Sequence, residues 1–341
     1  MMKYQKRNIP NLADVARSAG VSTATVSRCL NQSGKVSETT RQKVMEAVDA
    51  LRYTPNFGAR AIAANRTGIF GAIIPTMENS IFAKGIEAFQ KALVQKNATM
   101  IVASSAYDPE QEAKLVRTVV GRGADGLLLI GTERDPDTYA FLEERGIPSV
   151  IAWNKVQDLH RSFVGFDNRA ASELLVTKAI HLGHKSFAFI SGRTIGNDRA
   201  RDRVAGAQDA IRAAGLDPNK MPVLETEYAV EIGRLAFDRL AKSGPLPSLV
   251  ICGNDVLAVG VILGAQARGL NVPQDLSVVG FDDIDLATVV NPPVTTVHVP
   301  HGEMGRIAGE ALLDLVETPD QPKRVELETY IVERGSLKAP R

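Results

Sequence analysis

Gly121-Arg-Gly-Ala-Asp-Gly126 is the stretch of this sequence whose spacing most directly suggests chemistry, because GxGxxG is the pattern of a dinucleotide-binding turn. Such a turn follows a strand and opens a helix, so that the pyrophosphate meets the N-terminus of the helix. Here the glycines instead follow an amphipathic stretch and lead into the apolar run Gly126–Ile130. We therefore interpret them as a turn that ends a helix. The sequence also contains no P-loop pattern.

Two pairs of histidines have a spacing that could suit a metal. His181 and His184 lie at the end of a helical pattern, next to a glycine. His298 and His301 flank a proline and have no third ligand nearby. We interpret both pairs as structural. No Ser/His/Asp or Cys/His set stands out either, so we expect no metal, no cofactor and no enzymatic activity.

The composition bounds the class of protein. A length of 341 residues predicts two or three domains, and 44% hydrophobic with 23% charged residues is typical of a folded, soluble chain. Two cysteines, Cys29 and Cys252, cannot form a disulfide framework. There is no run of 18 apolar residues, and the basic start of the chain lacks the apolar segment of a secretory signal. We expect a cytoplasmic protein that does not enter a membrane.

Charge is distributed unevenly along the chain. Residues 1–67 hold eleven Lys and Arg against four Asp and Glu, a net charge of +7, whereas the remainder holds 29 basic and 35 acidic residues, a net charge of −6. A basic head on a mildly acidic body indicates that the head meets a polyanion. A solvated charged surface is the alternative, and charge alone does not decide between the two.

The basic head has the pattern of a helix-turn-helix. Apolar residues at helical spacing predict helices over Leu12–Ala19, Thr23–Leu30 and Arg41–Leu51. Gly20 ends the first helix, and Ser22 and Ser37 stand where helix caps are expected. Pro55 then breaks the chain before 56–64, an Ala-rich stretch too short to be a stable helix alone.

From Gly68 onward, short apolar runs alternate with amphipathic stretches, which predicts parallel sheets covered by helices on both faces. More than six such strand–helix units are too many for one sheet of ordinary size, so we expect an α/β body of two lobes. The predicted strands are 69–75, 99–103, 126–130, 149–152, 186–190, 248–252 and 277–280. The predicted helices are 80–95, 109–122, 136–145, 168–182, 202–214, 229–242, 254–268 and 302–317.

The motifs of head and body together resemble those of one known family. The head stretches Asn11–Asn31, Val36–Val44 and Leu51–Asn56 resemble the headpiece of the lac/galactose repressor family. The resemblance continues in four blocks of the body: Gly183–Ile190, Arg203–Gly206, Cys252–Asp255 and Ser277–Asp283. It covers nearly the whole chain.

The resemblance implies a homodimeric transcriptional regulator with a periplasmic-binding-protein-like body. It implies a headpiece at 1–55, a hinge helix and linker at 56–67, and an effector-binding and dimerisation domain at 68–341. We place the first lobe at about 68–161 and 292–320 and the second at about 162–291 and 321–341, with crossings near 160–163, 290–293 and 320–322. The C-terminal stretch Val332–Arg341 has no apolar heptads, so we expect a dimer rather than a tetramer.

The resemblance also implies how the head contacts double-stranded, pseudo-palindromic operator DNA. Thr23, Ala24 and Arg28 match the family's base-contacting positions, and an arginine can make a bidentate contact to guanine. The expected contacts to the DNA backbone are Ser22, Asn31, Ser37 and Asn56; Ser22 and Ser37 can also be helix caps. In the hinge, Ala59 and Ile62 are expected at the minor groove, with Ile62 where the family usually carries a leucine wedge.

For the small-molecule effector, Arg203, Asn254 and Asp282 match positions that hold polar groups of the ligand. Phe82 and Trp153 are expected to supply a flat apolar wall, and Asp198 and Arg199 to join the site. The alternatives are strand-end capping for Asp282 and lobe packing for Trp153.

A sugar or sugar acid is the expected effector, and the alternative is a purine or another small metabolite that acts as a corepressor. Two other classes of protein fit the sequence less well. A periplasmic solute-binding protein would share the body. It would need an export signal, however, and it would not carry a basic helix-turn-helix head. An enzyme would need a phosphate loop or a nucleophile set.

Overall fold

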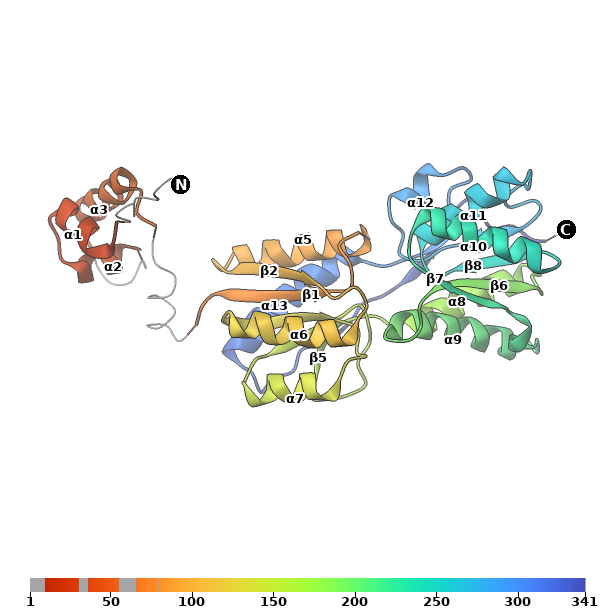
Figure 1. The fold of residues 1–341 in the computed structure, drawn as a ribbon, viewed down its shortest axis with the longest axis horizontal. Helices are drawn as coiled ribbons and strands as arrows, with labels where there is room; N and C mark the ends of the chain where they lie inside the picture. Colours follow the sequence, from red (N-terminus) through yellow and green to blue (C-terminus); the bar gives the residue numbers. More distant parts are fainter. Residues whose placement is uncertain (1–9, 31–35, 55–65, 79, 341) are drawn as a thin grey trace, which may run out of the picture. The chain divides into compact units, whose positions relative to one another are not determined.

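The computed structural model describes residues 10–30, 36–54, 66–78 and 80–340 (Figure 1). The chain forms two compact units, Met1–Thr67 and Gly68–Arg341. Among the predicted DNA-contacting residues, Asn31, Asn56, Ala59 and Ile62 lie outside the described residues, as does the whole segment 56–64. No helix within the described ranges is long and apolar enough to cross a membrane.

The described part of the first unit consists of α1 (Leu12–Ala19), α2 (Thr23–Leu30) and α3 (Glu38–Leu51). Asn11 and Asp14 form a reciprocal cap at the start of α1, in which each side chain accepts a hydrogen bond from the other residue's backbone N–H. Gly20 has a φ of 67°, which lets the chain turn directly from α1 toward α2. The helix-turn-helix that the sequence predicts is confirmed.

The core of this unit takes one fully buried valine from each helix, namely Val15, Val26 and Val44. Cys29 is buried in the same cluster, as expected for a small packing residue. Because Val26 and Cys29 of α2 point inward, the opposite side of this short helix is left to polar and small residues.

The second unit holds two parallel sheets (Figure 1). The first lobe has a six-stranded sheet, with the order β11-β5-β4-β3-β1-β2 and every pairing parallel. Its strands are β1 (Ile69–Ile74), β2 (Thr99–Ser104), β3 (Ala124–Ile130), β4 (Ser149–Ala152), β5 (Ser162–Gly165) and β11 (Arg324–Glu326). Its helices are α5 (Ser80–Val94), α6 (Pro109–Gly121), α7 (Pro136–Glu144) and α13 (His301–Glu317).

Both faces of this sheet are covered, as the continuous apolar runs predict. On β3, Leu128 and Ile130 join the cluster that contains residues of α5 and α13, while Leu127 and Leu129 join the cluster that contains residues of α6 and α7. Successive side chains of a strand point to opposite faces, so a buried strand must be apolar at every position.

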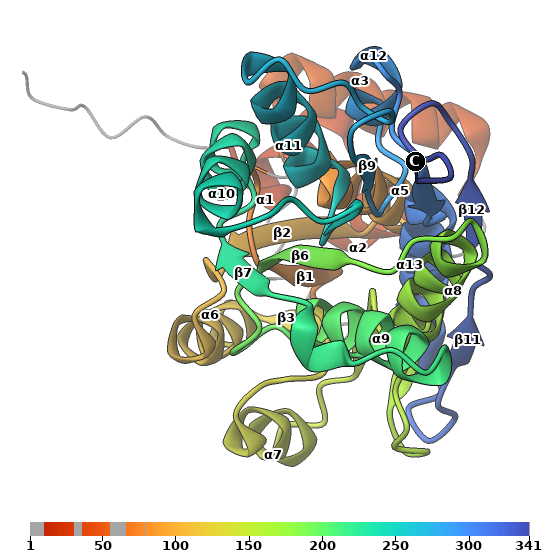
Figure 2. The ribbon, with the colours of Figure 1, turned by 90° about the vertical axis from the view of Figure 1, so that its right-hand side faces the viewer.

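The second lobe has a four-stranded parallel sheet with the order β7-β6-β8-β9. Figure 2 shows α8 and α9 on one face of this sheet and α10 and α11 on the other. Its strands are β6 (Phe187–Gly192), β7 (Val223–Thr226), β8 (Leu249–Cys252) and β9 (Ser277–Val279). Its helices are α8 (Asn168–His181), α9 (Asp198–Ala213), a short η1 (Pro218–Lys220), α10 (Val230–Ser243), α11 (Asp255–Ala267) and α12 (Leu286–Val289).

The chain crosses between the lobes later than the sequence suggested. The crossing predicted near 160–163 falls at the start of β5 and the one near 320–322 precedes β11, yet these two strands pair with each other in the first-lobe sheet. The crossing predicted near 290–293 comes before β10 (Thr296–His298), whose neighbour Thr295 still bridges to β9 of the second lobe. The predicted crossings were placed too early because β5, β10 and β11 were not recognised as strands in the sequence. β10 pairs with β12 (Tyr330–Val332) in a separate antiparallel pair.

The glycine motif lies where the sequence places it, between α6 and β3. Gly123 has a φ of 89°, so the motif is a turn that leaves a helix and enters a strand. Two of the histidines that were interpreted as structural are buried and hydrogen-bonded. His184 contacts the Ser248 hydroxyl and the Lys338 carbonyl, and His301 lies at the start of α13.

Candidate functional site

The exposed side of α2 carries the three residues predicted to contact bases. Thr23, Ala24 and Arg28 are exposed, whereas Val26 and Cys29 of the same helix are buried against α1 and α3. Among the described residues, the Arg28 guanidinium makes no hydrogen bond or ion pair. α2 therefore presents an unpaired planar cation one turn after two short exposed side chains, which suits contact with base edges in a major groove.

Both predicted backbone-contacting residues that the structure describes cap a helix. The Ser22 hydroxyl accepts a hydrogen bond from the Thr25 N–H at 3.1 Å, and the Ser37 hydroxyl accepts one from the Thr40 N–H at 3.3 Å. The remaining N–H groups of a helix N-terminus favour an anion such as a phosphate. The capping role and the proposed phosphate contact are thus compatible at both residues.

In the second unit, the three sequence-matched polar residues of the second lobe are brought together where its chain leaves the parallel strands. Asn254 follows β8 and caps α11, Asp282 follows β9, and Arg203 lies on α9. Ligands of open parallel sheets bind at this edge, beyond the carboxyl ends of the strands. Asp282 and Asp283 have φ values of 104° and 56°, conformations that non-glycine residues adopt at a cost and that cluster at functional sites.

The Arg203 side chain connects several groups at this edge of the second lobe. Its guanidinium donates to the Asn168 side-chain oxygen at 2.9 Å, to the Gly253 carbonyl at 2.7 Å and to an Asp282 carboxylate oxygen at 3.3 Å. It also lies over the Phe281 ring, 3.8 Å from the ring centroid. These contacts fix a buried positive charge next to a buried carboxylate.

Three buried polar atoms at the same edge have no hydrogen-bond partner within the described residues: the Ser191 hydroxyl, the Asn254 amide nitrogen and one Asp282 carboxylate oxygen. Unpartnered buried polar atoms are uncommon and costly, so each calls for a partner that the protein itself does not supply. Ser191 lies in β6, so all three atoms come from neighbouring strands of the second lobe. Together they offer a donor, an acceptor and a hydroxyl to a small polar ligand.

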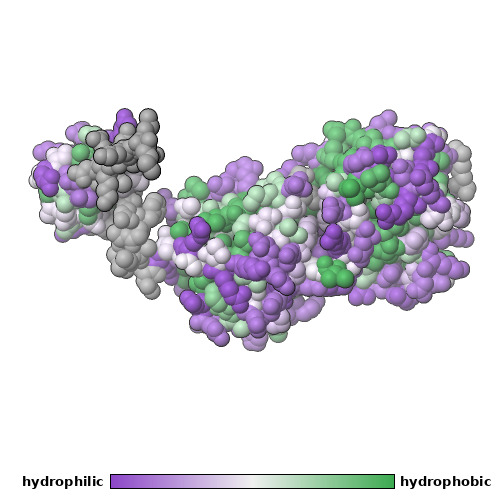
Figure 3. Space-filling view, in the orientation of Figure 1, coloured by the Kyte–Doolittle hydropathy of each residue, from purple (hydrophilic) through white to green (hydrophobic). Residues whose placement is uncertain are grey.

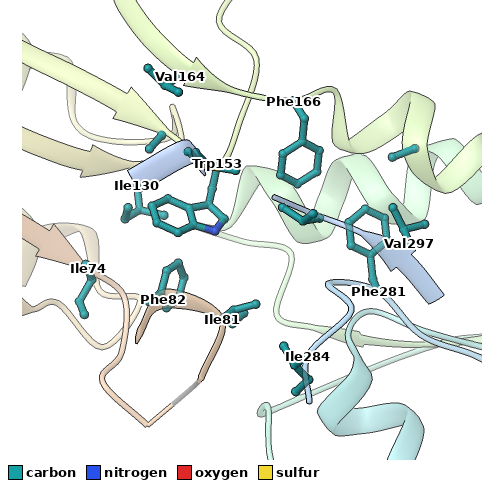
Figure 4. Packing of buried hydrophobic residues seen from close by; sticks show 14 of the residues in the cluster. Ile74, Ile81, Phe82, Ile130, Trp153, Val164, Phe166, Phe281, Ile284 and Val297 are labelled. Atoms are coloured by element: carbon teal, nitrogen blue, oxygen red, sulfur yellow. The ribbon is translucent and has the colours of Figure 1, made fainter. Parts of the chain in front are cut away.

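Phe82 and Trp153 pack together in the buried apolar cluster on the side of the first lobe (Figure 4). The two rings meet edge to face with centroids 5.4 Å apart. The Trp153 indole N–H donates to His301 Nδ1 at 3.0 Å, and His301 Nε2 lies 3.2 Å from the Asp282 carbonyl oxygen. His301 Nε2 must therefore carry the proton and donate to that carbonyl. Burial lowers the pKa of His301, which keeps the ring neutral.

Two tyrosines that the sequence did not suggest also lie at this site. Tyr107 follows β2 of the first lobe and Tyr228 follows β7 of the second, and their ring centroids are 6.1 Å apart. Burial raises the pKa of both hydroxyls, and Arg199 and Arg203 act on both electrostatically. The backbone marks the position of Tyr107, because Ala106 and Tyr107 both have a positive φ. The sequence alone does not reveal this conformation, so the two tyrosines could not be predicted as site residues.

Asp198 and Arg199, the remaining predicted site residues, are buried and engaged with each other. The Arg199 guanidinium donates to Asp198 at 2.8 Å. Burial alone would raise the pKa of Asp198, but the Arg199 charge and hydrogen bonds from Thr132 and Asn154 outweigh it and hold the pKa at about 2. A cavity of about 480 Å³ lies beside Asp198, with Thr132, Asn154 and Asp202 among its lining residues. All seven predicted effector residues are thus buried.

Comparison with known proteins gives matches over both units. Residues 11–56 match the model of the bacterial regulatory proteins of the lacI family, and residues 176–337 match the periplasmic binding protein-like domain. The chain is 32% identical over 330 residues to the HTH-type transcriptional repressor PurR of Vibrio cholerae, an alignment that covers 96% of this chain and 98% of that protein.

Solved structures agree. The lac repressor dimer bound to operator and the anti-inducer ONPF matches with a TM-score of 0.87 and 25% identity, over 97% of this chain and 99% of that one. A complex of the transcriptional regulator CelR with cellobiose matches with a TM-score of 0.70 and 28% identity, over 96% and 99%.

A helix-turn-helix unit joined to a two-lobed, periplasmic-binding-protein-like body defines a DNA-binding transcriptional regulator with an effector-binding domain. The chain belongs to the lacI family of bacterial regulatory proteins.

Proposed function

We propose that this regulator is a repressor whose affinity for its operator is set by a sugar or sugar acid bound between the two lobes. The observation that carries the proposal is the set of unpartnered buried polar atoms of Ser191, Asn254 and Asp282 beside the fixed Arg203 guanidinium. A ligand that fills this site contacts both lobes, because Phe82 and Trp153 belong to the first lobe and the polar residues to the second.

The chemistry of these atoms favours a polyhydroxylated ligand. A hydroxyl group can donate to a carboxylate oxygen and accept from an amide N–H, which are the two unpartnered functions of Asp282 and Asn254. An adjacent flat aromatic wall suits the apolar face of a sugar ring, and the charge of Arg203 suits an acid group. The cellobiose complex of one structural relative is in line with this class of effector.

A purine or similar small metabolite acting as a corepressor is the second candidate. The edge of a purine also offers N–H donors and ring-nitrogen acceptors, which Asp282 and Asn254 could pair with. The aromatic rings of Tyr107 and Tyr228 favour this reading, since flat heteroaromatic ligands stack on such rings.

On the DNA side, we propose that Thr23, Ala24 and Arg28 of α2 read base edges in the major groove, and that Ser22, Asn31, Ser37 and Asn56 contact phosphates. Ala59 and Ile62 are proposed to meet the minor groove, with Ile62 as the apolar wedge. Because this target is operator DNA, we place the protein in the cytoplasm.

We further propose that the protein acts as a homodimer, because two heads are needed to span the half-sites of a pseudo-palindromic operator. A surface suited to a second copy is present on the second lobe. Apolar side chains gather over α12 and near α11 (Figure 3), where Val289 and Leu263 are exposed. Such a patch on a protein surface typically marks an interaction site.

The effector is tested by ligand discovery on the full-length protein. Small molecules that co-purify with the chain are identified by mass spectrometry, and candidate sugars, sugar acids and purines are then titrated by calorimetry against wild type and Asp282→Asn. We expect a sugar or sugar acid to bind wild type and to bind the variant at least tenfold more weakly. Binding of purines alone would replace the carbohydrate proposal by the corepressor candidate.

The DNA-binding part is tested separately by selecting bound sequences from a random duplex pool. A pseudo-palindromic consensus is the expected product. Recovery of sequences without two related half-sites would contradict the proposed dimeric reading of an operator.

A further inference from the structure

Two buried carboxylates of the second lobe are in opposite situations. Asp282 has one oxygen without a partner, whereas the Asp198 carboxylate is fully occupied by the protein itself. Asp282 therefore keeps an acceptor free for a ligand, whereas Asp198 does not. This difference raises the question of what the Asp198 carboxylate does.

The role of the Asp198 carboxylate follows from its hydrogen-bond partners, because they come from both lobes. Asp198 is the first residue of α9 in the second lobe. One of its oxygens accepts from the Thr132 N–H, from the Thr132 hydroxyl at 2.6 Å and from the Asn154 amide at 2.8 Å. Thr132 follows β3 and Asn154 follows β4, so all three donors belong to the first lobe. The other oxygen accepts from the Arg199 backbone N–H and guanidinium.

The local backbone is shaped to allow this contact. Gly131, which precedes Thr132, has a φ of 73°, and a Cβ atom there would lie 1.9 Å from an Arg199 guanidinium nitrogen and 2.5 Å from an Asp198 oxygen. Only glycine leaves room for the ion pair of the second lobe to approach the first lobe so closely. The contact is therefore built into both lobes.

Other cross-lobe ion pairs are weaker candidates for holding the lobes together. Lys84 pairs with Asp285 at 2.8 Å, and Arg201 pairs with Glu133, but the side chains of both pairs are largely exposed. Exposed ion pairs contribute little, whereas charge-assisted hydrogen bonds in a buried site are stronger. Asp198 is 2% exposed.

We propose that Asp198, Thr132 and Asn154 form a clasp that holds the two lobes closed without any ligand. In this protein the effector would then not be needed to close the cleft: it binds Asp282 and Asn254 in lobes that the clasp already holds together. A variant without the clasp depends on the ligand for closure.

The test measures the distance between the lobes in the full-length protein, with neither operator nor effector present. Its failure is therefore distinguishable from a failure of the proposed function. Single cysteines replace Ala140 on α7 and Ala213 on α9, both exposed, and carry spin labels for pulsed electron-electron distance measurement. The native Cys29 and Cys252 are buried, and burial raises the pKa of the Cys252 thiol, so labelling under native conditions is confined to the new sites. Labelled chains are diluted into unlabelled ones so that distances within one chain are read.

Three variants are compared with wild type. Asp198→Ala removes the clasp from the second lobe, and Thr132→Val removes one hydroxyl from the first lobe at nearly constant size. Asp209→Ala is the matched control: it also lies on α9 and is paired, but only with Arg169 and Arg212 of the same lobe. Circular dichroism melts check that each variant is folded.

We expect a narrow distance distribution for wild type and Asp209→Ala, a broad distribution shifted to longer distances for Asp198→Ala, and an intermediate one for Thr132→Val. If Asp198→Ala does not fold, Thr132→Val alone decides, and a wild-type distribution for it overturns the proposal. A broad, long-distance distribution in ligand-free wild type also overturns it, as does an unchanged distribution in folded Asp198→Ala.

Discussion

Arg28 and Arg203 show how one residue type serves two tasks through its surroundings. Arg28 is exposed and unpaired within the described part of the chain, so its donors remain available to a base edge. Arg203 is buried, and three acceptors of the protein occupy its guanidinium. We propose that the first residue recognises DNA and that the second holds the effector site in shape.

Replacing Arg28 with alanine tests the first task. We expect Arg28→Ala to weaken operator binding by about 1–3 kcal/mol and to relax the preference at one base pair in each half-site. Arg28→Lys is the matched control, because it keeps the charge but loses the bidentate geometry; it should retain affinity for nonspecific DNA and still lose the preference. Binding titrations on operators with single mismatches measure both quantities. Unchanged discrimination in Arg28→Ala would remove Arg28 from base reading.

Replacing Arg203 tests the second task. Arg203→Ala leaves the Asn168 and Gly253 oxygens and the Asp282 carboxylate without their donor, and loss of one partner of a buried ion pair costs about 3–5 kcal/mol of stability. We expect the response of operator affinity to the effector to disappear, while ligand-free DNA binding persists below the melting temperature of the variant. DNA titrations with and without the identified effector measure this. A wild-type response would show that Arg203 is not part of the site.

Asp255 gives a prediction on pH. Burial raises the pKa of Asp255 to about 8, although hydrogen bonds from Thr296 and the Ile284 N–H lower it. An unfolded aspartate titrates near pH 4, so between about pH 4 and 8 the folded protein holds a proton that the unfolded chain lacks. The contribution of Asp255 to the free energy of unfolding therefore falls as the pH rises through this window and is level above it.

Asp255→Asn mimics the protonated acid and removes this dependence. We expect its stability relative to wild type to rise between pH 5 and pH 8, by up to about 1.4 kcal/mol for each pH unit. Urea unfolding at the two pH values measures the difference. The exposed Asp320→Asn serves as control and should follow wild type. Parallel profiles for Asp255→Asn and wild type would mean that Asp255 is ionised in the folded state.

At the scale of elements, glycines set the distance between the helices of each packed pair. A Cβ atom on Gly305 of α13 would lie 1.9 Å from the Gly85 carbonyl oxygen of α5. The same relation holds for Gly206 of α9 against the Arg169 carbonyl of α8, and for Gly260 of α11 against the Val230 carbonyl of α10. Glycine disfavours a helix interior, so its presence here reflects close backbone packing rather than helix formation.

The pair Gly305 and Gly302 turns this into a controlled experiment, because both lie in α13 and only one contacts another backbone. We expect Gly305→Ala to destabilise the protein by about 1–3 kcal/mol, since α5 and α13 must separate. A Cβ atom on Gly302 would meet nothing within 4 Å, so Gly302→Ala should be neutral or slightly stabilising. Urea unfolding midpoints measure both. Equal effects at the two positions would contradict close packing as the cause.

Most strands that the sequence predicted contain a continuous apolar run, and β3 and β8 are buried on both faces. The missed β7 lies at the edge of its sheet with alternating half-exposed residues, and the missed β11 is Arg324-Val-Glu326. These two edge strands lack a buried apolar run, so they could not be predicted from hydropathy. The missed β5 is buried, but its apolar run is only Phe163-Val164.

The same limit applies to the candidate site. Arg203, Asn254 and Asp282 could be placed because each lies within a recognisable block of sequence. Tyr107 and Tyr228 could not, since they come from turns in different lobes and meet only through the fold. The partners of Asp198 were hidden for the same reason: Thr132 and Asn154 belong to no motif.

At the scale of the whole molecule, the apolar surface around α11 and α12 predicts the site of self-association. We expect Leu263→Lys to shift the protein from dimer to monomer at micromolar concentration and to weaken operator binding, because charged residues are excluded from interface cores. Leu174→Lys is the control, because Leu174 is also exposed but belongs to α8, on the opposite face of the second-lobe sheet from α11. Light scattering measures the mass. A dimeric Leu263→Lys, or a wild-type monomer, would contradict this interface.

Trp153 is the only tryptophan of the chain, and its place gives the molecule an optical property. The indole is buried beside Phe82 and hydrogen-bonded to His301, which in turn contacts the Asp282 carbonyl on the other lobe. Tryptophan emission shifts to longer wavelength when the ring becomes exposed to water. The tryptophan fluorescence of this protein therefore comes from a single buried position between the lobes, and we expect it to report opening, filling and operator-induced change in unlabelled protein.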